Sequence, residues 1–271
     1  MLQNLYGDRP TKLQKELQKI AMLSEPTLQQ LKSVDPDRFR AAVFADKDGC
    51  ERLQILYAFH YELAKVPELV SEPMIGQIRY QWWRDAVAEI YEGRAVRQHE
   101  ITTPLAKVLI DYDVPRLWVG RLIDGRERDL DPRPFANIEE AREYCRQTSG
   151  VLMQIAVKLL GEEPDDAVLA AGEAWGLTGL ARAYMYYQDG MLSSIGFLDI
   201  CQAAQQCRNI AARGLHALPS TAFPAVAYAA LVPKFITRLK QVKHDPKTMS
   251  VSYSPFLKQL RLMGAVMRGK V

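Results

Sequence analysis

Long apolar runs are absent from this sequence of 271 residues. No stretch approaches the ~20 consecutive apolar residues that a membrane-spanning helix needs. The N-terminus also lacks an apolar segment behind its charges and carries acids early, which argues against a secretory signal and a mitochondrial presequence. We therefore expect a cytoplasmic protein, and peripheral contact with a membrane surface stays open.

The sequence also has little excess charge of either sign and few cysteines. The 35 Lys and Arg residues nearly balance the 32 Asp and Glu residues, so the net charge is only +3. No stretch interleaves clustered cations with aromatic residues, and nucleic acid is therefore not expected as a partner. The four cysteines have no metal-like spacing: Cys50, Cys145, Cys201 and Cys207. Free thiols in a reducing compartment are favoured over disulfides.

Strand signals are missing as well, because no segment alternates apolar and polar residues between hairpin turns. No fixed-period repeat and no low-complexity linker divides the chain. What is present is helical periodicity, and with 48% hydrophobic residues the chain can bury a sizeable core. We predict an all-α protein of about ten helices, with an N-terminal helical extension over residues 1–34 and one helical domain over residues 35–271.

The densest helical pattern covers residues 53–91 and predicts a helical hairpin. Pro67 interrupts the first apolar run, and the second helix is expected to begin with Ser71 as its N-cap and Pro73 in its first turn. The apolar face of that helix consists of Ile75, Ile78, Trp82, Ala86 and Ile90. The hairpin is expected to form one wall of a pocket.

Caps and prolines predict other helix boundaries. A helix that begins within residues 35–40 is expected to end at Asp48-Gly49. Asn137 and Glu140 form a capping box that opens a long helix reaching residue 159. A helix that begins near residue 164 is crowded with Ala and Gly, which predicts a central helix, with its glycines there for close packing or for ligand access.

Two C-terminal helices are also expected. Residues 224–242 predict a helix that is kinked at Pro233. Residues 256–267 predict an amphipathic helix that turns Lys258, Arg261 and Arg268 towards solvent.

Three segments resemble motifs of the squalene/phytoene synthase family, in the same order. They are LYAF at residues 56–59, LIDGRERDL at 122–130 and YCRQTSG at 144–150, which are similar to an LYAF-type helix, a "DGMRMDL"-like turn and a "YCxxVAG"-like helix. The likeness extends from about residue 35 to residue 267. It implies an all-α isoprenoid synthase bundle around a central apolar cavity. Active members join two prenyl diphosphates head to head, with Mg²⁺ held by two aspartate-rich motifs on facing helices.

The chain departs from that family at both metal sites. Ala64-Lys65-Val66-Pro67-Glu68 stands where active relatives carry a DDxxD-type motif, and Tyr61 stands where they carry an arginine. The second motif falls on Ala183, Tyr186, Tyr187 and Met191, with Asp189 off its register. One acid per cluster is a poor Mg²⁺ site, and a lysine beside the ion would repel it. We expect no cofactor and no efficient catalysis by the family's route.

A branch of the family lacks these aspartates in the same way. Residues 59–85, 176–182 and 197–201 are similar to the branch of respiratory complex I assembly factors and their bacterial relatives. The resemblance implies a non-catalytic, lipid- or isoprenoid-binding factor that assists assembly of complex I. Its partners would be subunits of the respiratory complex, and it would contact the inner membrane peripherally.

Five residues are candidate ligand-binding positions: Lys65, Arg79, Arg84, Tyr144 and Arg182. In the family fold the four cations would line the former diphosphate opening and bind a long-chain lipid or an isoprenoid diphosphate without metal, and Tyr144 matches a position that faces the cavity. The alternative is that the cations face solvent and pair with Glu62, Glu68 or Asp85.

A second function stays open, namely a prenyltransferase that condenses isoprenoid diphosphates head to head. It would hold Mg²⁺ on the residual acids Glu62, Glu68 and Asp189. An enzyme of another class is not expected, because the sequence has no Ser-His-Asp, Cys-His or His-Glu metal signature.

Several side chains near these motifs have a structural interpretation beside a functional one. His60 is expected to be a hydrogen-bonded core residue rather than a ligand or base. Of the adjacent Trp82 and Trp83, one should be in the core and the other should line a pocket or an edge. For Tyr144, a cavity position and a core position are equally favoured. Two acids, Asp124 and Asp129, are expected to cap helices or to pair with Arg126 and Arg128.

Overall fold

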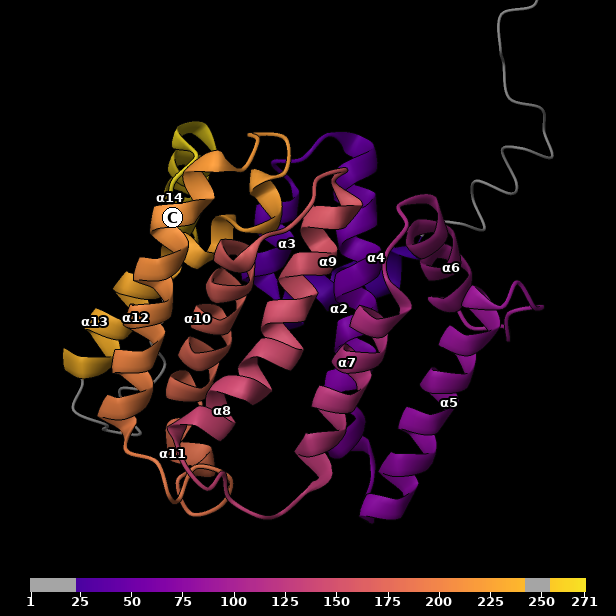
Figure 1. Ribbon diagram of the computed structural model, residues 1–271, viewed down its shortest axis with the longest axis horizontal. Helices are drawn as coiled ribbons and strands as arrows, with labels where there is room; N and C mark the ends of the chain where they lie inside the picture. The colour runs from indigo at the N-terminus through magenta and orange to yellow at the C-terminus, as the bar shows by residue number, and fades with distance from the viewer. Residues whose placement is uncertain (1–22, 242–253) are drawn as a thin grey trace, which may run out of the picture.

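The computed structural model describes residues 23–241 and 254–271. Within these residues the regular structure is helical throughout, which confirms the all-α prediction (Figure 1). The first half contains α2 (Glu25–Val34), α3 (Pro36–Ala42), α4 (Lys47–Ala64), α5 (Pro73–Tyr91), α6 (Thr102–Asp111) and α7 (Arg116–Glu127). The second half contains α8 (Ile138–Cys145), α9 (Val151–Leu159), α10 (Asp166–Arg182), α11 (Tyr184–Tyr187), α12 (Phe197–Gly214), α13 (Val232–Gln241) and α14 (Pro255–Arg268).

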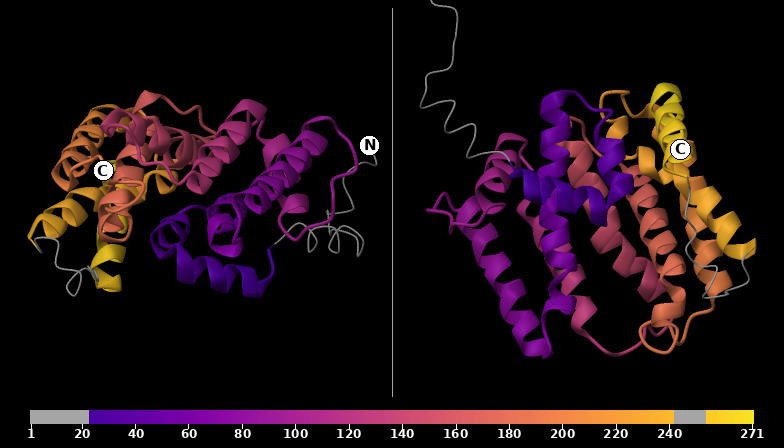
Figure 2. Two further views of the ribbon diagram at one scale, coloured as in Figure 1. Left: turned by 90° about the horizontal axis from the view of Figure 1, so that it is seen from below. Right: turned by 180° about the vertical axis from the view of Figure 1, so that it is seen from behind.

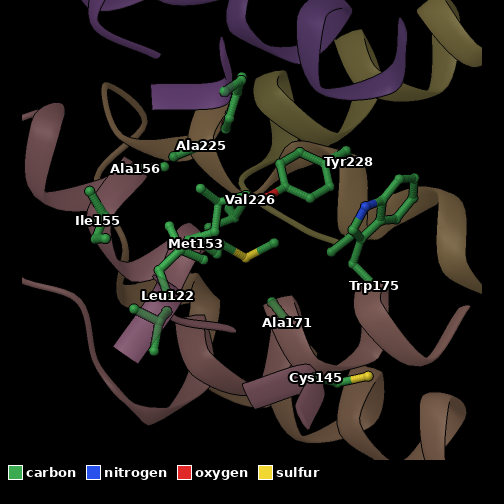
Figure 3. Packing of buried hydrophobic residues seen from close by; sticks show 14 of the residues in the cluster. Leu122, Cys145, Met153, Ile155, Ala156, Ala171, Trp175, Ala225, Val226 and Tyr228 are labelled. Atoms are coloured by element: carbon green, nitrogen blue, oxygen red, sulfur yellow. The ribbon is translucent and has the colours of Figure 1, made fainter. Parts of the chain in front are cut away.

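Helix α10 lies at the centre of the bundle, as its small residues predict. It packs against α12 on one side and against α8, α9 and the π-helical turn η3 (Arg146–Gly150) on the other. Figure 3 shows the core that results, in which Ala171 and Trp175 of α10 face side chains of α9 and of the segment before α13. Small side chains permit this close approach, because they occupy little space between neighbouring backbones.

The helical hairpin of α4 and α5 is present and is joined by the short 3₁₀ turn η1 (Val66–Leu69). Large side chains connect its two arms. The rings of Phe59 and Trp83 are 5.2 Å apart, and the Tyr80 hydroxyl donates to the carbonyl oxygen of Leu63 at 3.0 Å. The space between the arms is therefore lined by aromatic side chains, and the hairpin walls a pocket as predicted.

Two details of the hairpin differ from the sequence-based expectation. The N-cap of α5 is Glu72 rather than Ser71, although Pro73 does occupy the first turn. Ile75 and Ile78 are exposed, whereas Ala86 and Ile90 on the same face are buried. Helix α5 lies at the edge of the bundle (Figure 1), and Ile78 faces the open pocket between the hairpin arms with Val66 and Leu69.

The expected end of a helix at Asp48-Gly49 was wrong. Helix α3 ends at Ala42, and both residues lie in the first turn of α4. The cause is Asp46, whose carboxylate accepts the Gly49 N–H at 2.8 Å and thereby caps α4.

The long helix predicted from Asn137 is confirmed but contains the π-helical turn η3 between α8 and α9. The Asn137 side chain accepts the N–H groups of Glu139 and Glu140 at 3.0 and 3.1 Å. The Glu140 carboxylate in turn accepts the N–H of Ala136 at 2.7 Å, which completes the cap.

The kinked helix expected over residues 224–242 was also wrong. Two 3₁₀ turns, η5 (Phe223–Ala225) and η6 (Ala227–Leu231), precede α13, and Pro233 lies in the first turn of α13. A proline in a first turn removes no helical hydrogen bond, so no kink arises.

The last helix, α14, corrects one prediction and confirms two. Arg261 and Arg268 are exposed, but Lys258 is buried. Its ammonium group lies 2.8 and 3.0 Å from the two carboxylate oxygens of Asp37 in α3, which is also buried. Helical periodicity placed Lys258 at the margin of the polar face, and the buried acid on α3 draws it inward.

Two further predictions concern the N-terminal extension and the cysteines. Helix α2 packs against α3 and α4, residues 1–22 lie outside the described residues, and the division at residues 34 and 35 stays a prediction. All four cysteines are free thiols, as expected. No helix in the described part of the chain is both long enough and apolar enough to cross a bilayer.

Candidate ligand-binding cavity

A cavity of about 350 Å³ lies between the C-terminal end of α4, helix α7, the α8–η3 segment and α10. Both regions in which the family carries metal-binding motifs contribute to its wall. Ala64, Pro67 and Glu68 come from the first region, and Tyr187 and Met191 come from the second. Trp175, Gly176, Gly179 and Leu180 of α10 add an apolar side.

Arg126 of α7 is the centre of a hydrogen-bond network in the wall of this cavity. One terminal nitrogen donates to the Asp129 carboxylate at 3.1 Å and to the Tyr144 hydroxyl at 2.8 Å. The other terminal nitrogen lies 2.8 Å from Nε2 of His60. The Tyr144 hydroxyl donates to the second oxygen of Asp129 at 2.7 Å, so the acid is held from both sides.

The contact between Arg126 and His60 determines the protonation state of the imidazole. A guanidinium group only donates hydrogen bonds, so Nε2 of His60 is the acceptor and the ring is neutral with its proton assigned to Nδ1. Burial lowers the pKa of His60 well below its usual value, and the positive charges of Arg126 and Arg38 lower it further. His60 is therefore the buried, hydrogen-bonded residue that the sequence predicted.

Arg38 of α3 is a second guanidinium group in the cavity wall. It is 6% exposed, it donates to Asp35 at 2.7 Å, and its guanidinium carbon lies 5.2 Å from the ring centroid of Tyr228. The Nε atoms of Arg38 and Arg126 are both buried without a hydrogen-bond partner. Both guanidinium groups nevertheless line the cavity, and groups of this kind suit an anionic oxygen.

The donor set does not fit a magnesium ion. Glu68 and Asp129 are the acids in the wall, and Asp129 already binds Arg126 and Tyr144. Within residues 23–241 and 254–271, no three His, Cys, Asp or Glu side chains lie close enough together to hold a metal. Mg²⁺ needs several anionic oxygens to offset its reluctance to lose water, and this wall offers it two guanidinium groups instead.

Comparison with known proteins identifies the family. Residues 31–190, more than half of the chain, match squalene/phytoene synthase. The chain belongs to the squalene/phytoene synthase family. Solved structures show the same fold: a dehydrosqualene synthase superposes with a TM-score of 0.73 at 16% identity, covering 93% of this chain and 97% of that chain. Squalene synthase HpnC of Alicyclobacillus acidocaldarius gives a TM-score of 0.57 at 14% identity, covering 94% of this chain and 96% of that chain.

The proteins similar in sequence include complex I assembly factors and a phytoene synthase. "NADH dehydrogenase (ubiquinone) complex I, assembly factor 6" of Bos taurus is 25% identical over 248 residues, which cover 80% of this chain and 74% of that protein. The human protein of the same name gives the same identity and coverage. "15-cis-phytoene synthase" of a Paracoccus strain is 26% identical over 126 residues, covering 44% of this chain and 39% of that protein.

The predicted ligand-binding residues lie in different places. Tyr144 lines the cavity and joins the Arg126 network. Lys65 and Arg79 instead line a separate pocket of about 310 Å³ between the arms of the hairpin, together with Trp82, Trp83 and His99. That pocket also contains Glu62, which pairs with Lys65.

Arg84 and Arg182 lie away from both hollows. Arg84 binds Asp124 at 2.7 Å and also pairs with Glu127, both on α7. Arg182 is exposed, with its guanidinium carbon 4.7 Å from the ring centroid of Phe235. Lys65 thus pairs with Glu62, one of the partners named in the sequence-based alternative. The partners of Arg84 are two acids of α7 that the alternative did not name.

The structure also places the tryptophans and the acids that the sequence analysis singled out. Trp83 is buried and Trp82 is half-buried beside the hairpin pocket, as predicted for adjacent tryptophans. Asp129 pairs with Arg126 as expected, whereas Asp124 pairs with Arg84 rather than with Arg126 or Arg128. Of the residual acids, Glu68 lines the cavity, Glu62 faces the hairpin pocket, and Asp189 is exposed beyond α11.

Sequence reasoning missed Arg126 and Arg38 as cavity residues. The signal for Arg126 was available, because it stands in the DGRERDL segment where the family pattern "DGMRMDL" has a methionine. Arg38 gave no comparable signal. Its position in the first turn of a helix, just after Asp35 and Pro36, is equally typical of a surface residue.

Proposed function

We propose that this protein is a non-catalytic member of the squalene/phytoene synthase family that assists the assembly of respiratory complex I. In this proposal it is a cytoplasmic protein that contacts the inner membrane peripherally and acts on subunits of the complex. The observation that carries the proposal is the cavity wall: Ala64, Pro67, Tyr187 and Met191 line it from the two motif regions, and two guanidinium groups from other helices face the same cavity. Support for the assembly role comes from the names of the bovine and human relatives.

The proposed ligand of the cavity is a long-chain lipid or an isoprenoid diphosphate, bound without metal or other cofactor. Arg126 donates three hydrogen bonds within the protein, and a guanidinium group has five N–H donors. The unpaired terminal N–H group of Arg126 and the terminal N–H groups of Arg38 would bind anionic oxygens, each such bond contributing about 1.5–3 kcal/mol. Trp175, Leu180 and Met191 would contact the apolar chain.

Thermal denaturation with farnesyl diphosphate tests the cavity proposal. A ligand that binds the folded state raises the melting temperature, and we expect the same rise in EDTA as in Mg²⁺. Arg126→Met should abolish the rise, and Arg126→Lys should weaken it because the planar fork is lost. Arg133→Met, at an exposed arginine paired with Asp131, is the control and should leave the rise unchanged. A rise that requires Mg²⁺ would contradict metal-free binding.

Loss of the gene tests the assembly role. In a strain of the source organism without this protein, we expect less assembled complex I and lower NADH:quinone activity in membranes. The wild-type chain should restore both, and Arg126→Met should restore them poorly if the ligand is required. Normal amounts of assembled complex I in the deletion strain would refute the role.

The alternative function is a Mg²⁺-dependent prenyltransferase of the squalene/phytoene synthase type, supported by the family and by the phytoene synthase relative. It would need Glu62, Glu68 and Asp189 to act together as metal ligands. Pyrophosphate release from farnesyl diphosphate in Mg²⁺, with an aspartate-replete relative as the positive control, distinguishes the two functions. Release at a rate near that of the control would favour the enzyme.

A further inference from the structure

Helix α14 turns an apolar stripe away from the protein. Phe256, Leu260, Met263 and Met267 are 69%, 43%, 40% and 78% exposed, respectively. Their spacing of four, three and four residues places them on one face of the helix. A contiguous apolar surface of this kind usually marks a binding surface.

The opposite face of α14 is anchored on the body of the protein. Leu262 and Ala265 are buried, and the helix packs against α3 and η6. The buried Lys258–Asp37 ion pair fixes the rotation of α14 about its axis, with distances of 2.8 and 3.0 Å. The outward direction of the stripe therefore follows from specific buried contacts.

The surroundings of the stripe are strongly basic. Neither α13 nor α14 contains an acid, and apart from the buried, paired Lys258 they carry Lys234, Arg238, Lys240, Arg261 and Arg268. Residues 228–271 contain nine Lys and Arg residues against one Asp, although the net charge of the whole chain is only +3. The rest of the chain is therefore acidic, and the C-terminal part of the sequence carries the positive charge. Helices α13 and α14 lie at the same edge of the molecule (Figure 2, right).

We propose that α14 docks on the surface of an anionic lipid bilayer. The stripe of Phe256, Leu260, Met263 and Met267 would enter the boundary between headgroups and acyl chains. Arg261, Arg268 and the exposed Arg238 and Lys240 of α13 would contact the lipid phosphates. An apolar helix face flanked by cations, without an acid, is the pattern of helices that lie in the membrane interface. This inference rests on the peripheral membrane contact in the proposed function and adds the surface and the lipid charge.

Flotation of the full chain with lipid vesicles tests this surface. We expect binding to vesicles of phosphatidylcholine mixed with phosphatidylglycerol, little binding to phosphatidylcholine alone, and a decrease with salt. The double variant Phe256→Ser/Met267→Ser should bind at least about 10-fold more weakly, because buried apolar area is lost. Arg261→Ala/Arg268→Ala should weaken binding to the anionic vesicles only.

The matched control is Met74→Ser/Ile78→Ser, which changes two exposed apolar residues on α5. It should bind vesicles as the wild type does, and all three variants should keep the wild-type melting temperature because they alter exposed side chains. Equal binding of the α14 variant and the wild type would overturn the proposal, as would equal binding to neutral vesicles. A dimer that the α14 variant dissociates, without vesicle binding, would assign the stripe to a second copy of the chain. The assay contains neither complex I nor a prenyl diphosphate, so its failure would leave the assembly and cavity proposals standing.

Discussion

At the scale of single residues, the contact between Arg126 and His60 is the least usual feature of the cavity. A permanently charged guanidinium lies 2.8 Å from an imidazole that must stay neutral to accept its hydrogen bond. Protonation of His60 would place two positive groups in contact within a buried site. The pair is compatible with folding only while the imidazole remains unprotonated.

The stability of the protein should therefore depend on the protonation of His60. Because the folded-state pKa of His60 is lowered from 6.5, the unfolded chain binds a proton in mildly acidic solution and the folded chain does not. The free energy of unfolding should thus fall as the pH drops below about 6.5, by up to about 1.4 kcal/mol per pH unit for this group. His60→Gln retains an acceptor for Arg126 but lacks the titration, so its free energy of unfolding should decline less between neutral pH and pH of about 5.5.

Urea unfolding of both proteins at the two pH values provides the measurement. His216→Gln, at an exposed histidine of the 3₁₀ turn Leu215–Ala217, should keep the wild-type pH dependence. If His60→Gln and the wild type lost the same stability on acidification, His60 would not be responsible.

At the scale of elements, α10 approaches the π-helical turn η3 so closely that a glycine is required. A Cβ atom on Gly172 would lie 2.5 Å from the carbonyl oxygen of Ser149 and 2.6 Å from Cα of Gly150. Both atoms belong to the backbone, which cannot move aside without shifting the turn. The contact explains why the central helix tolerates the low helix propensity of glycine at this position.

Gly172→Ala should therefore destabilise the protein, by about 2 kcal/mol if the turn shifts as in other overpacked cores. Gly179 in the same helix is the matched control, because no heavy atom lies within 4 Å of the position of its Cβ. Gly179→Ala should leave stability unchanged or raise it by up to about 1 kcal/mol through helix propensity. Urea midpoints measure both effects, and equal stability of the two variants would contradict the packing argument.

The ion pair between Asp37 and Lys258 joins α3 to α14 across more than two hundred residues of sequence. Lys258→Met should cost about 3 kcal/mol, because it leaves the Asp37 carboxylate buried with only Arg40 nearby, at 3.6 Å. The double variant Asp37→Asn/Lys258→Met should be more stable than Lys258→Met, since no unpaired carboxylate remains. A double variant less stable than the single one, measured by urea unfolding, would contradict this account, because the Asp37 carboxylate without Lys258 would then be stabilising, for example through Arg40.

At the scale of the whole molecule, the four thiols report on the integrity of the fold. Burial raises the pKa of Cys201 to about 11 and of Cys207 to about 12, and it raises the pKa of Cys145 well above its usual value. At neutral pH these groups are almost entirely protonated and shielded, so they should react very slowly with an aromatic disulfide reagent. Cys50 is half-buried with a raised pKa and should react first. In guanidinium chloride all four should react quickly, whereas fast reaction of the buried thiols in the native protein would contradict the core described above.

The fold itself was predictable from the sequence because its signals are local. Helical periodicity, the Asn137 cap and the small residues of α10 act over one or two turns, and they predicted the corresponding elements. One error arose where a longer contact decides the outcome. Asp37 draws Lys258 into the interior across the fold. The misplaced helix end at Asp48-Gly49 is different, because the Asp46 cap that begins α4 there is itself a local signal that the prediction overlooked.

The sequence by itself determined the helical architecture, the family resemblance and the loss of acids at both motif positions. Each of these can be read from residue types at fixed spacing along the chain. Only the tertiary structure decided which polar side chains line the cavity. Arg38, Arg126 and Tyr144 come from three separate helices that meet through packing of the core. The periodicity of one helix does not specify which neighbour covers each face, and for that reason Arg126 and the outward stripe of α14 became apparent only in three dimensions.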